Sequence, residues 1–361
     1  MAAPSPITRK IMSAKRHIDD EQPDTIQAHF ESLLMDEQEI DDETEEMTIR
    51  DLPEWYNEKL FKTGQNYCKR NRLAVCSALV LGVLTTFILP EVLKLLIWTK
   101  QSGTPCSSFR RYLRTILHIM TLNSSDINDP ESSWWKSLNV IRWKHGTASR
   151  KSGQSGPGRI LNRDMAIAQF SFIGYILIMP DKFGLTNEAK EREGFNHLWK
   201  VIGHLLGIPD KFNICRKNEG ETTQLCHKLQ DEIFIKYMKN EPEKFKSMAH
   251  AYLEGAWYID PTLDADSLMY FWYNISGLEY KKPLGLFSQL NYKFRLGLIY
   301  LLGVPIVGDV LRFLSNYYLE ICLWSATNFN ILAWLRFGKS NTKINLHPYT
   351  KKIGNTTADC K

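Results

Sequence analysis

The chain has 361 residues, and its hydrophobic (43%) and charged (24%) fractions are those of an ordinary globular protein, which excludes a collagen, a coiled coil and a wholly disordered chain. The net charge of +5 conceals a division, because residues 19–46 carry thirteen Asp or Glu and no Lys or Arg, so the rest is strongly basic. A basic body suits anionic lipid headgroups, nucleic acid or acidic substrates. Since no nucleic-acid-binding motif accompanies the charge, we expect no nucleic-acid partner.

Residues 1–50 are acidic and poor in aromatic side chains, a composition typical of a disordered tail. From Asp51 onwards apolar residues recur at helical spacing, while alternating strand patterns are scarce. We therefore predict one all-α domain over residues 51–340, followed by a polar C-terminal tail over residues 341–361. The seven Cys have neither metal-binding nor haem-attachment spacing, so reduced thiols facing the cytosol fit best.

Two apolar stretches raise the question of a membrane. Residues 73–89 carry no charge and follow a basic segment, so the stretch over 73–97 is either a transmembrane helix near the minimum length or a helix buried in the core. Glycine, proline and charged residues interrupt the second stretch, over 296–335, as is typical of helices that pack in a core or dock on a bilayer. We expect a membrane-associated protein whose body faces the cytosol, with the endoplasmic reticulum as a candidate membrane.

Helical spacing brings basic and polar side chains together within residues 110–118. Arg111 lies one turn from Thr115, and Arg114 lies one turn from His118, on a helix whose remaining positions are mostly apolar. An apolar helix is normally buried, and burying a guanidinium group without an anionic partner is costly. Something anionic should therefore meet Arg111 and Arg114.

The sequence leaves three sources for that anion open: a protein carboxylate such as Glu91 or Asp164, a haem propionate, or a lipid phosphate. Asp164 also stands at a predicted helix start, where a carboxylate stabilises the positive end of the helix dipole. Gln169 lies further into the same apolar helix and must find a hydrogen-bond partner if it is buried. The sequence motifs of serine hydrolases, kinases and nicotinamide-dependent enzymes are absent.

Histidines are the candidate metal ligands. His145 lies three residues after Arg142, and one imidazole is all that an iron porphyrin needs, because the macrocycle supplies the other four ligands. A single His is nevertheless more often structural or exposed than a ligand. His197 and His204 lie seven residues apart in an amphipathic helix predicted over residues 187–206, but no motif of a non-haem metal site accompanies them.

These residues occur in an order and spacing that resemble the family joining the ER-bound oxygenase of mycophenolic acid biosynthesis to the catalytic domain of latex-clearing rubber oxygenases. Each element is unspecific alone, and the shared order and spacing give the resemblance its weight. It covers residues 51–337 and rests on five elements: Pro53-Glu-Trp55 with Gly64-Gln65; Arg111-x-x-x-Thr115; Val140-Ile-Arg142-x-x-His145; Asp164-Met-Ala-x-x-Gln169; and His197-Leu-Trp-Lys-Val-Ile-Gly203 with Asp210-x-x-Asn213.

The resemblance implies a globin-like helical core with additional helices, haem b as cofactor, and dioxygen-dependent cleavage of carbon–carbon double bonds in isoprenoid chains. By position, His145 would be the proximal iron ligand and Arg142 would help to bind the cofactor, while Arg111 and Thr115 would belong to the haem-pocket helix. Rubber-cleaving members have a Lys that closes the distal site, where this chain has Arg114. A guanidinium group does not deprotonate and cannot ligate iron, so the distal site would be open.

Two functions follow from this reasoning. In the first, the protein is a membrane-associated, haem-dependent oxygenase acting on an apolar isoprenoid or lipid-like substrate, with Arg111, Arg114 and Thr115 as catalytic residues and Glu91 as the nearest candidate for an acidic base. In the second, it is a non-catalytic membrane-associated protein that retains the fold and binds lipid or a partner but no metal. A cavity at His145 wide enough for a porphyrin would favour the enzyme, and a filled core would favour the second function.

Overall fold

The computed structural model describes residues 18–42, 45–185 and 188–348. These residues form helices and contain one isolated antiparallel bridge, between Glu39 and Leu161, but no β-strand. The all-α prediction is therefore confirmed.

The α-helices in chain order are α2 (Ile18–Glu21), α3 (Ile26–Met35), α4 (Glu58–Arg70), α5 (Arg72–Phe87), α6 (Pro90–Thr99), α7 (Pro105–Leu122), α8 (Ser133–Ser155), α9 (Asn162–Ala168), α10 (Phe170–Ile178), α11 (Ala189–Leu205), α12 (Glu219–Leu229), α13 (Ile235–Lys239), α14 (Phe245–Trp257), α15 (Ala265–Ile275), α16 (Leu286–Leu302), α17 (Val307–Asn328), α18 (Ile331–Phe337) and α19 (Lys339–Thr342). Short turns complete the set: η1 (Ile49–Asp51), η2 (Pro180–Phe183), η3 (Asp210–Phe212) and the wider η4 (Gln230–Phe234).

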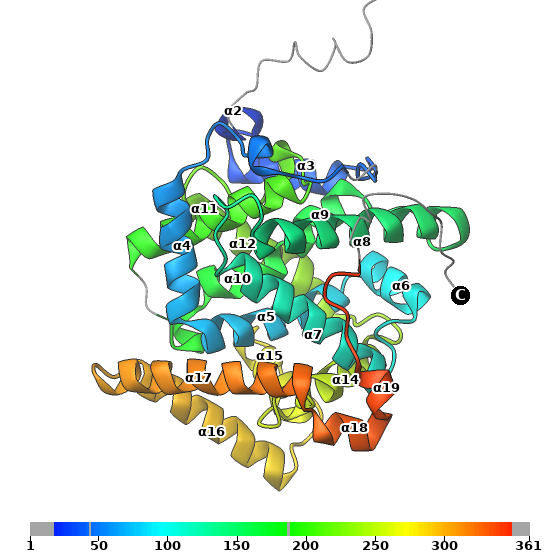
Figure 1. Ribbon diagram of the computed structural model, residues 1–361, viewed down its shortest axis with the longest axis vertical. Helices are drawn as coiled ribbons and strands as arrows, with labels where there is room; N and C mark the ends of the chain where they lie inside the picture. The colour runs from blue at the N-terminus through cyan, green and yellow to red at the C-terminus, as the bar shows by residue number, and fades with distance from the viewer. Residues whose placement is uncertain (1–17, 43–44, 186–187, 349–361) are drawn as a thin grey trace, which may run out of the picture.

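The helices form a layered body with a distinct element at each end (Figure 1). The N-terminal helices α2 and α3 lie at one end, and the hairpin of α16 and α17 lies at the other. Between them α4 packs on α11, α5 on α10, and α7 on α14. The candidate site residues lie on α7 and α8, which are consecutive in the chain and pack on each other.

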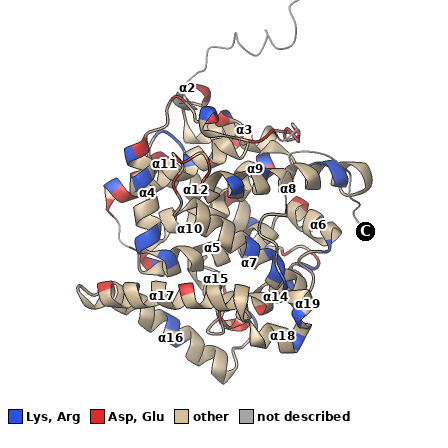
Figure 2. Cartoon of the chain, in the orientation of Figure 1, with Lys and Arg blue, Asp and Glu red and all other residues tan. Residues whose placement is uncertain are grey.

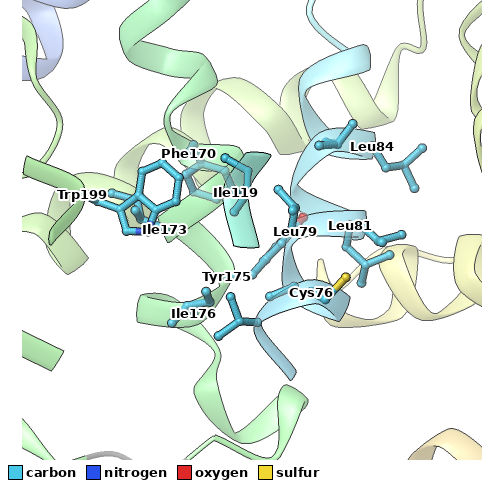
Figure 3. Close-up of a cluster of buried hydrophobic side chains, with 14 of the residues drawn as sticks. Cys76, Leu79, Leu81, Leu84, Ile119, Phe170, Ile173, Tyr175, Ile176 and Trp199 are labelled. Carbon is cyan, nitrogen blue, oxygen red and sulfur yellow. The ribbon is translucent and has the colours of Figure 1, made fainter. Parts of the chain in front are cut away.

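Helix α5 lies in the core of this body. Twelve of its sixteen residues are buried, and Figure 3 shows its leucines among side chains of α10. At its end a buried hydrogen-bond network joins three helices, because the Thr85 hydroxyl lies 2.8 Å from the Tyr175 hydroxyl and accepts the Trp272 indole N–H at 2.8 Å. Residues 72–87 of the stretch predicted as a transmembrane or core helix thus form a helix that is buried among other helices.

Length and apolar composition limit which of the described helices could cross a membrane. No single helix among them is long and apolar enough to cross a membrane. Helices α4 and α5 are long and apolar enough to cross a membrane only when taken together, and the chain bends by 92° between them.

The helix pairs approach closely where one partner has no side chain. A Cβ on Gly82 of α5 would lie 2.1 Å from the Ser171 carbonyl oxygen of α10. A Cβ on Gly64 of α4 would lie 2.3 Å from the carbonyl oxygen of Gly194 in α11. Such distances do not occur in real structures, so only glycine allows these backbones to pack at this separation.

The prediction of a disordered tail over residues 1–50 is wrong for its described part. Thr25 caps α3 by accepting the N–H of Ala28 at 3.1 Å, and Phe30 and Leu33 are buried against the core. The average composition of residues 1–50 conceals the apolar face of α3, because the few apolar residues of this helix lie on one face among many acidic residues. The part of the prediction that concerns residues 1–17 lies outside the described residues.

The predicted C-terminal tail is likewise ordered where the structure describes it. Ile344 packs against the core, and the His347 ring centroid lies 5.8 Å from that of His118 on α7. Residues 343–348, red in Figure 1, therefore lie against α7, and residues 349–361 lie outside the described part of the chain.

We predict that Gly82→Ala lowers the free energy of unfolding by about 1–3 kcal/mol, because the new methyl group must displace the α10 backbone. Gly297→Ala is the matched control, since nothing lies within 4 Å of a Cβ at that position of α16. This control should raise the free energy by about 0.5–1 kcal/mol, the ordinary gain of alanine over glycine in a helix. Urea denaturation measures both, and an unchanged midpoint for Gly82→Ala would contradict the close packing.

Candidate functional site

Helices α7 and α8 carry a group of basic side chains that we call the cationic cluster: Arg111, Arg114 and His118 of α7 with Lys144 and His145 of α8. Local sequence sets the ends of both helices. Thr104 and Ser107 form a capping box at the start of α7, which has Pro105 in its first turn. Ser132 caps α8 by accepting the Trp134 N–H at 3.2 Å. Helical spacing then places the α7 members on neighbouring turns.

No carboxylate of the described residues forms an ion pair with Arg111, Arg114 or Lys144. Arg111 donates only a long hydrogen bond of 3.4 Å to the Thr99 hydroxyl, and Arg114 donates to the Arg110 carbonyl at 3.1 Å. The cluster therefore lacks the protein anion that such charges require, and Figure 2 shows blue along α7.

The two carboxylates considered as partners are engaged elsewhere. Glu91 is exposed and pairs with Lys94 one turn along α6, at 2.8 Å. Asp164 accepts the Leu161 N–H at 3.4 Å at the start of α9, as its predicted capping role requires. In the described part of the chain, therefore, no protein carboxylate meets the cluster. Of the three proposed sources of the anion, the haem propionate and the lipid phosphate remain as alternatives.

Burial and mutual repulsion shift the titration of the cluster. Burial, followed by the charges of Arg114 and Arg111, lowers the pKa of Lys144 from 10.5 to about 8. Burial, followed by the charge of Arg111, lowers the pKa of His145 from 6.5 to about 4. Burial and the charge of Lys144 likewise lower the pKa of His118 to about 3. Both imidazoles are therefore neutral at pH 7, the form that binds metals.

His145 has the features of a metal ligand, but no large cavity adjoins its side chain. Its side chain is half-buried, and its Nδ1 is buried without a hydrogen-bond partner. The adjoining cavity measures about 10 Å³, room for about one water molecule. Its lining residues are Ile40, Asp41, Arg142, His145, Gly146, Met165, Leu206 and Gly207.

The donor chemistry and the volume of this site give opposite results for haem. A neutral imidazole surrounded by unpaired cations suits an iron centre that carries carboxylates. Pockets for drug-sized ligands, however, enclose about 300–1,000 Å³, far more than the space beside His145. A second cavity, of about 80 Å³ between α4, α5, α7 and α17, is also too small.

Two predicted site residues serve the fold. The Arg142 guanidinium donates to the Leu205 carbonyl at 2.8 Å and so satisfies the C-terminal end of α11, while its Nε is buried without a partner and Arg142 lines the cavity beside His145. The Thr115 hydroxyl donates to the Arg111 carbonyl one turn back, at 3.2 Å. Thr115 therefore lies beside the cluster, and its hydroxyl proton is already donated to a hydrogen bond within α7.

His197 and His204 are also structural. His197 Nε2 accepts the Asn57 N–H at 2.9 Å, and His204 Nδ1 lies 2.7 Å from Asp210 Oδ1. Both rings contact the edge or face of Trp55. No group of three or more His, Cys, Asp or Glu among the described residues could hold a metal ion. The motif residues around Trp55 therefore serve to fix the start of α4 against α11.

Gln169 is buried and finds the partners that burial requires. Its amide group donates to the Trp199 carbonyl at 3.0 Å and accepts the Ile214 N–H at 3.3 Å. Asn213 acts in the same region, where it donates to the Lys200 carbonyl at 2.9 Å. These two motif residues therefore hold the C-terminal part of α11, and they do not reach the cationic cluster.

Sequence reasoning missed two contributors to the cluster. Lys144 is central to its electrostatics, but it was not among the predicted site residues, because an isolated Lys carries no motif. His347 approaches His118 from a segment expected to be a tail, although the apolar residues Ile344 and Leu346 beside it are a signal of packing.

Comparisons with known proteins agree with this fold at low sequence identity. No protein-family model and no curated protein matches the chain. A solved structure of latex clearing protein in its closed state matches with a TM-score of 0.57 and 15% identity, over 76% of each chain. At this identity the match shows a shared all-α fold, on the rubber-oxygenase side of the resemblance, and the relation to the ER-bound oxygenase stays a prediction.

We predict that Lys144→Met stabilises the protein at pH 7, by an amount on the order of 2 kcal/mol, because it removes a desolvated ammonium group that Arg111 and Arg114 repel. Lys136→Met is the control on the same helix, since Lys136 is exposed and should change stability by less than about 0.5 kcal/mol. Urea denaturation of ligand-free protein makes the comparison. Destabilisation by Lys144→Met would mean that the ammonium group has an anionic partner.

We predict a pH dependence from His118. Its folded pKa lies below the unfolded value of 6.5, so the unfolded chain alone binds a proton as pH falls, and stability falls by up to about 1.4 kcal/mol per pH unit. This loss begins near pH 6.5 and continues towards the folded pKa of about 3. His118→Gln should therefore gain stability relative to the natural chain between pH 7 and pH 4, whereas His227→Gln, at an exposed position, should not. Equal slopes for the natural chain and His118→Gln in urea denaturation would count against a buried neutral imidazole.

Proposed function

We propose that this protein is an oxidoreductase, a haem-dependent oxygenase that acts on an apolar isoprenoid or lipid-like substrate with dioxygen. The observation that carries the proposal is the cationic cluster, where a neutral imidazole lies among half-buried positive charges that no described carboxylate neutralises. The shared fold with latex clearing protein and the ordered motifs support the same class.

The chain's own residues would divide the work as follows. His145 would ligate iron through its unpartnered nitrogen, which burial keeps deprotonated at neutral pH. Arg111 and Lys144 would neutralise the carboxylates of the cofactor, which in turn removes their mutual repulsion. Haem would supply the chemistry of dioxygen activation, and the protein would supply binding, orientation and a dry site.

Arg114 would have a different part in this arrangement. It cannot ligate iron, because a guanidinium group does not deprotonate, so it would not occupy a position that dioxygen needs. Its half-buried guanidinium group, whose pKa is lowered by burial and by the charges of Arg110 and Arg111, would instead attract developing negative charge. Glu91 would have no role as a base, since it is exposed and paired with Lys94.

A second candidate function rests on the volume beside His145. A cavity of about 10 Å³ matches the filled core expected of a non-catalytic protein that retains the fold. In that protein the cationic cluster would bind a smaller anionic ligand, such as a lipid phosphate, and His145 would hold no metal.

The test is the absorption spectrum of the purified protein, with haem quantified per chain. The oxygenase should have a Soret band at about one haem per chain, because a single imidazole from the protein is sufficient to ligate haem iron. His145→Ala should lose the band, while Arg114→Ala and the exposed control His227→Ala should keep it. A folded, colourless protein that takes up no added haem, or a His145→Ala variant with full haem content, would refute the assignment. The former result would favour the non-catalytic protein.

A further inference from the structure

The exposed apolar residues of this protein are concentrated at one end. Among the described residues, nineteen of the twenty-one large hydrophobic side chains that are exposed lie between positions 286 and 335. The other two, Leu34 and Met35, lie on α3 at the opposite end of the molecule in Figure 1. We call the surface formed by the nineteen residues of α16, α17, α18 and their connections the α16–α18 apolar face.

Helix α17 shows how this face arises. One side packs on the body through Leu319, Cys322, Leu323 and Ala326. The outer side carries a second stripe at steps of three and four residues, which extends over about 26 Å of this 22-residue helix. The stripe consists of Val307, Val310, Leu314, Tyr317, Ile321 and Trp324, and each of these side chains is at least 43% exposed.

Helix α16 is exposed to a still greater degree. Only Ser288 and Leu302 of its seventeen residues are buried, although the helix is largely apolar. Leu286, Leu290, Phe294 and Leu301 follow one another at steps of four, four and seven residues, a helical spacing that places them on its exposed side. Figure 1 shows α16 and α17 as a hairpin along the edge of the molecule, and the two helices pack on each other, so their exposed apolar residues lie on neighbouring helices.

The area of this face is too large for an ordinary protein surface. Taking about 150–250 Å² for a large apolar side chain, the nineteen residues expose an area on the order of 2,000 Å². The largest apolar patch of a typical soluble monomer is about 300–600 Å². Contact with water over such an area is unfavourable, so the face requires an apolar partner.

The charge around the face identifies the partner. Residues 281–343 contain eight Lys or Arg and two Asp or Glu. Lys281, Lys293, Arg336 and Lys339 are exposed, as is Lys282, which also pairs with Asp266, and Figure 2 shows blue segments on α16 and α18. A second copy of the chain, bound through the same face, would bring basic residues against basic residues. Anionic lipid headgroups provide the opposite charge.

The aromatic residues agree with a lipid partner. Tyr300, Tyr317 and Trp324 are each at least 59% exposed, and Tyr and Trp side chains are enriched where hydrocarbon meets headgroups. We propose that the α16–α18 apolar face docks this protein in the plane of an anionic lipid bilayer, with its apolar side chains at the acyl boundary and its basic residues among the headgroups. This inference goes beyond the oxygenase proposal and does not depend on haem.

The test is flotation of the full chain with vesicles of phosphatidylcholine alone or mixed with phosphatidylserine. The natural chain should float with the mixed vesicles, and more weakly with phosphatidylcholine or at high salt, because counterions screen the headgroup attraction. Phe313→Asp and Trp324→Asp should each weaken binding by about tenfold or more, since each places a charge where an apolar side chain meets lipid. Met35→Asp is the matched control, an 80% exposed apolar residue at the opposite end, and should bind like the natural chain.

Folding of the variants is checked by their thermal unfolding, which should be unchanged because Phe313 and Trp324 are 71% and 64% exposed. Lys281→Glu with Lys282→Glu should abolish the preference for phosphatidylserine while leaving weak binding to phosphatidylcholine. Undiminished flotation of Phe313→Asp and Trp324→Asp would overturn the proposal. So would a natural chain that fails to float and is a stable dimer dissociated by Phe313→Asp, since the face would then bind a second copy.

Discussion

The close approach of helix backbones is the constraint on which the rest of this structure depends. Gly82 allows α5 to lie against Ser171 of α10, and Gly64 and Gly194 allow the same for α4 and α11. Gly255 of α14 has this role towards α7, because a Cβ there would lie 2.8 Å from the Phe109 nitrogen. Because these contacts are fixed, the packed core determines where α7 and α8 lie, even though several of their side chains carry like charges.

That rigidity explains how the cationic cluster can exist. Buried like charges would normally separate or find carboxylates, and each of these outcomes requires α7 or α8 to move or a neighbouring acid to approach. Glu91 and Asp164 are the acids considered for that role, and both are engaged elsewhere. The stability provided by the packed core therefore offsets an electrostatic cost at α7 and α8, an arrangement typical of binding sites. An anionic ligand would recover that cost on binding.

The cationic cluster and the α16–α18 apolar face each lack a binding partner, and the partners they lack differ in chemistry. The cationic cluster lacks an anion, and the α16–α18 apolar face lacks an apolar partner. Residues 343–348 follow α19, and His347 in this segment contacts His118 in the cluster, so one short segment links the two regions in space. A lipid bilayer contains both phosphate and hydrocarbon, which makes an apolar substrate drawn from the membrane consistent with both proposals.

The sequence by itself determined the helices and the pairing of groups within them. Periodic apolar residues predicted the all-α fold, and fixed spacing on one helix placed Arg111 beside Thr115 and Arg114 near His118, because helix geometry is local. Only the tertiary structure decided what lies across from each residue. It turned Arg142 to the Leu205 carbonyl, brought Lys144 to Arg114, and left the outer stripe of α17 bare. An apolar stripe has the same period whether it meets a core or a membrane, so its partner is set by long-range packing that spacing along the chain does not encode.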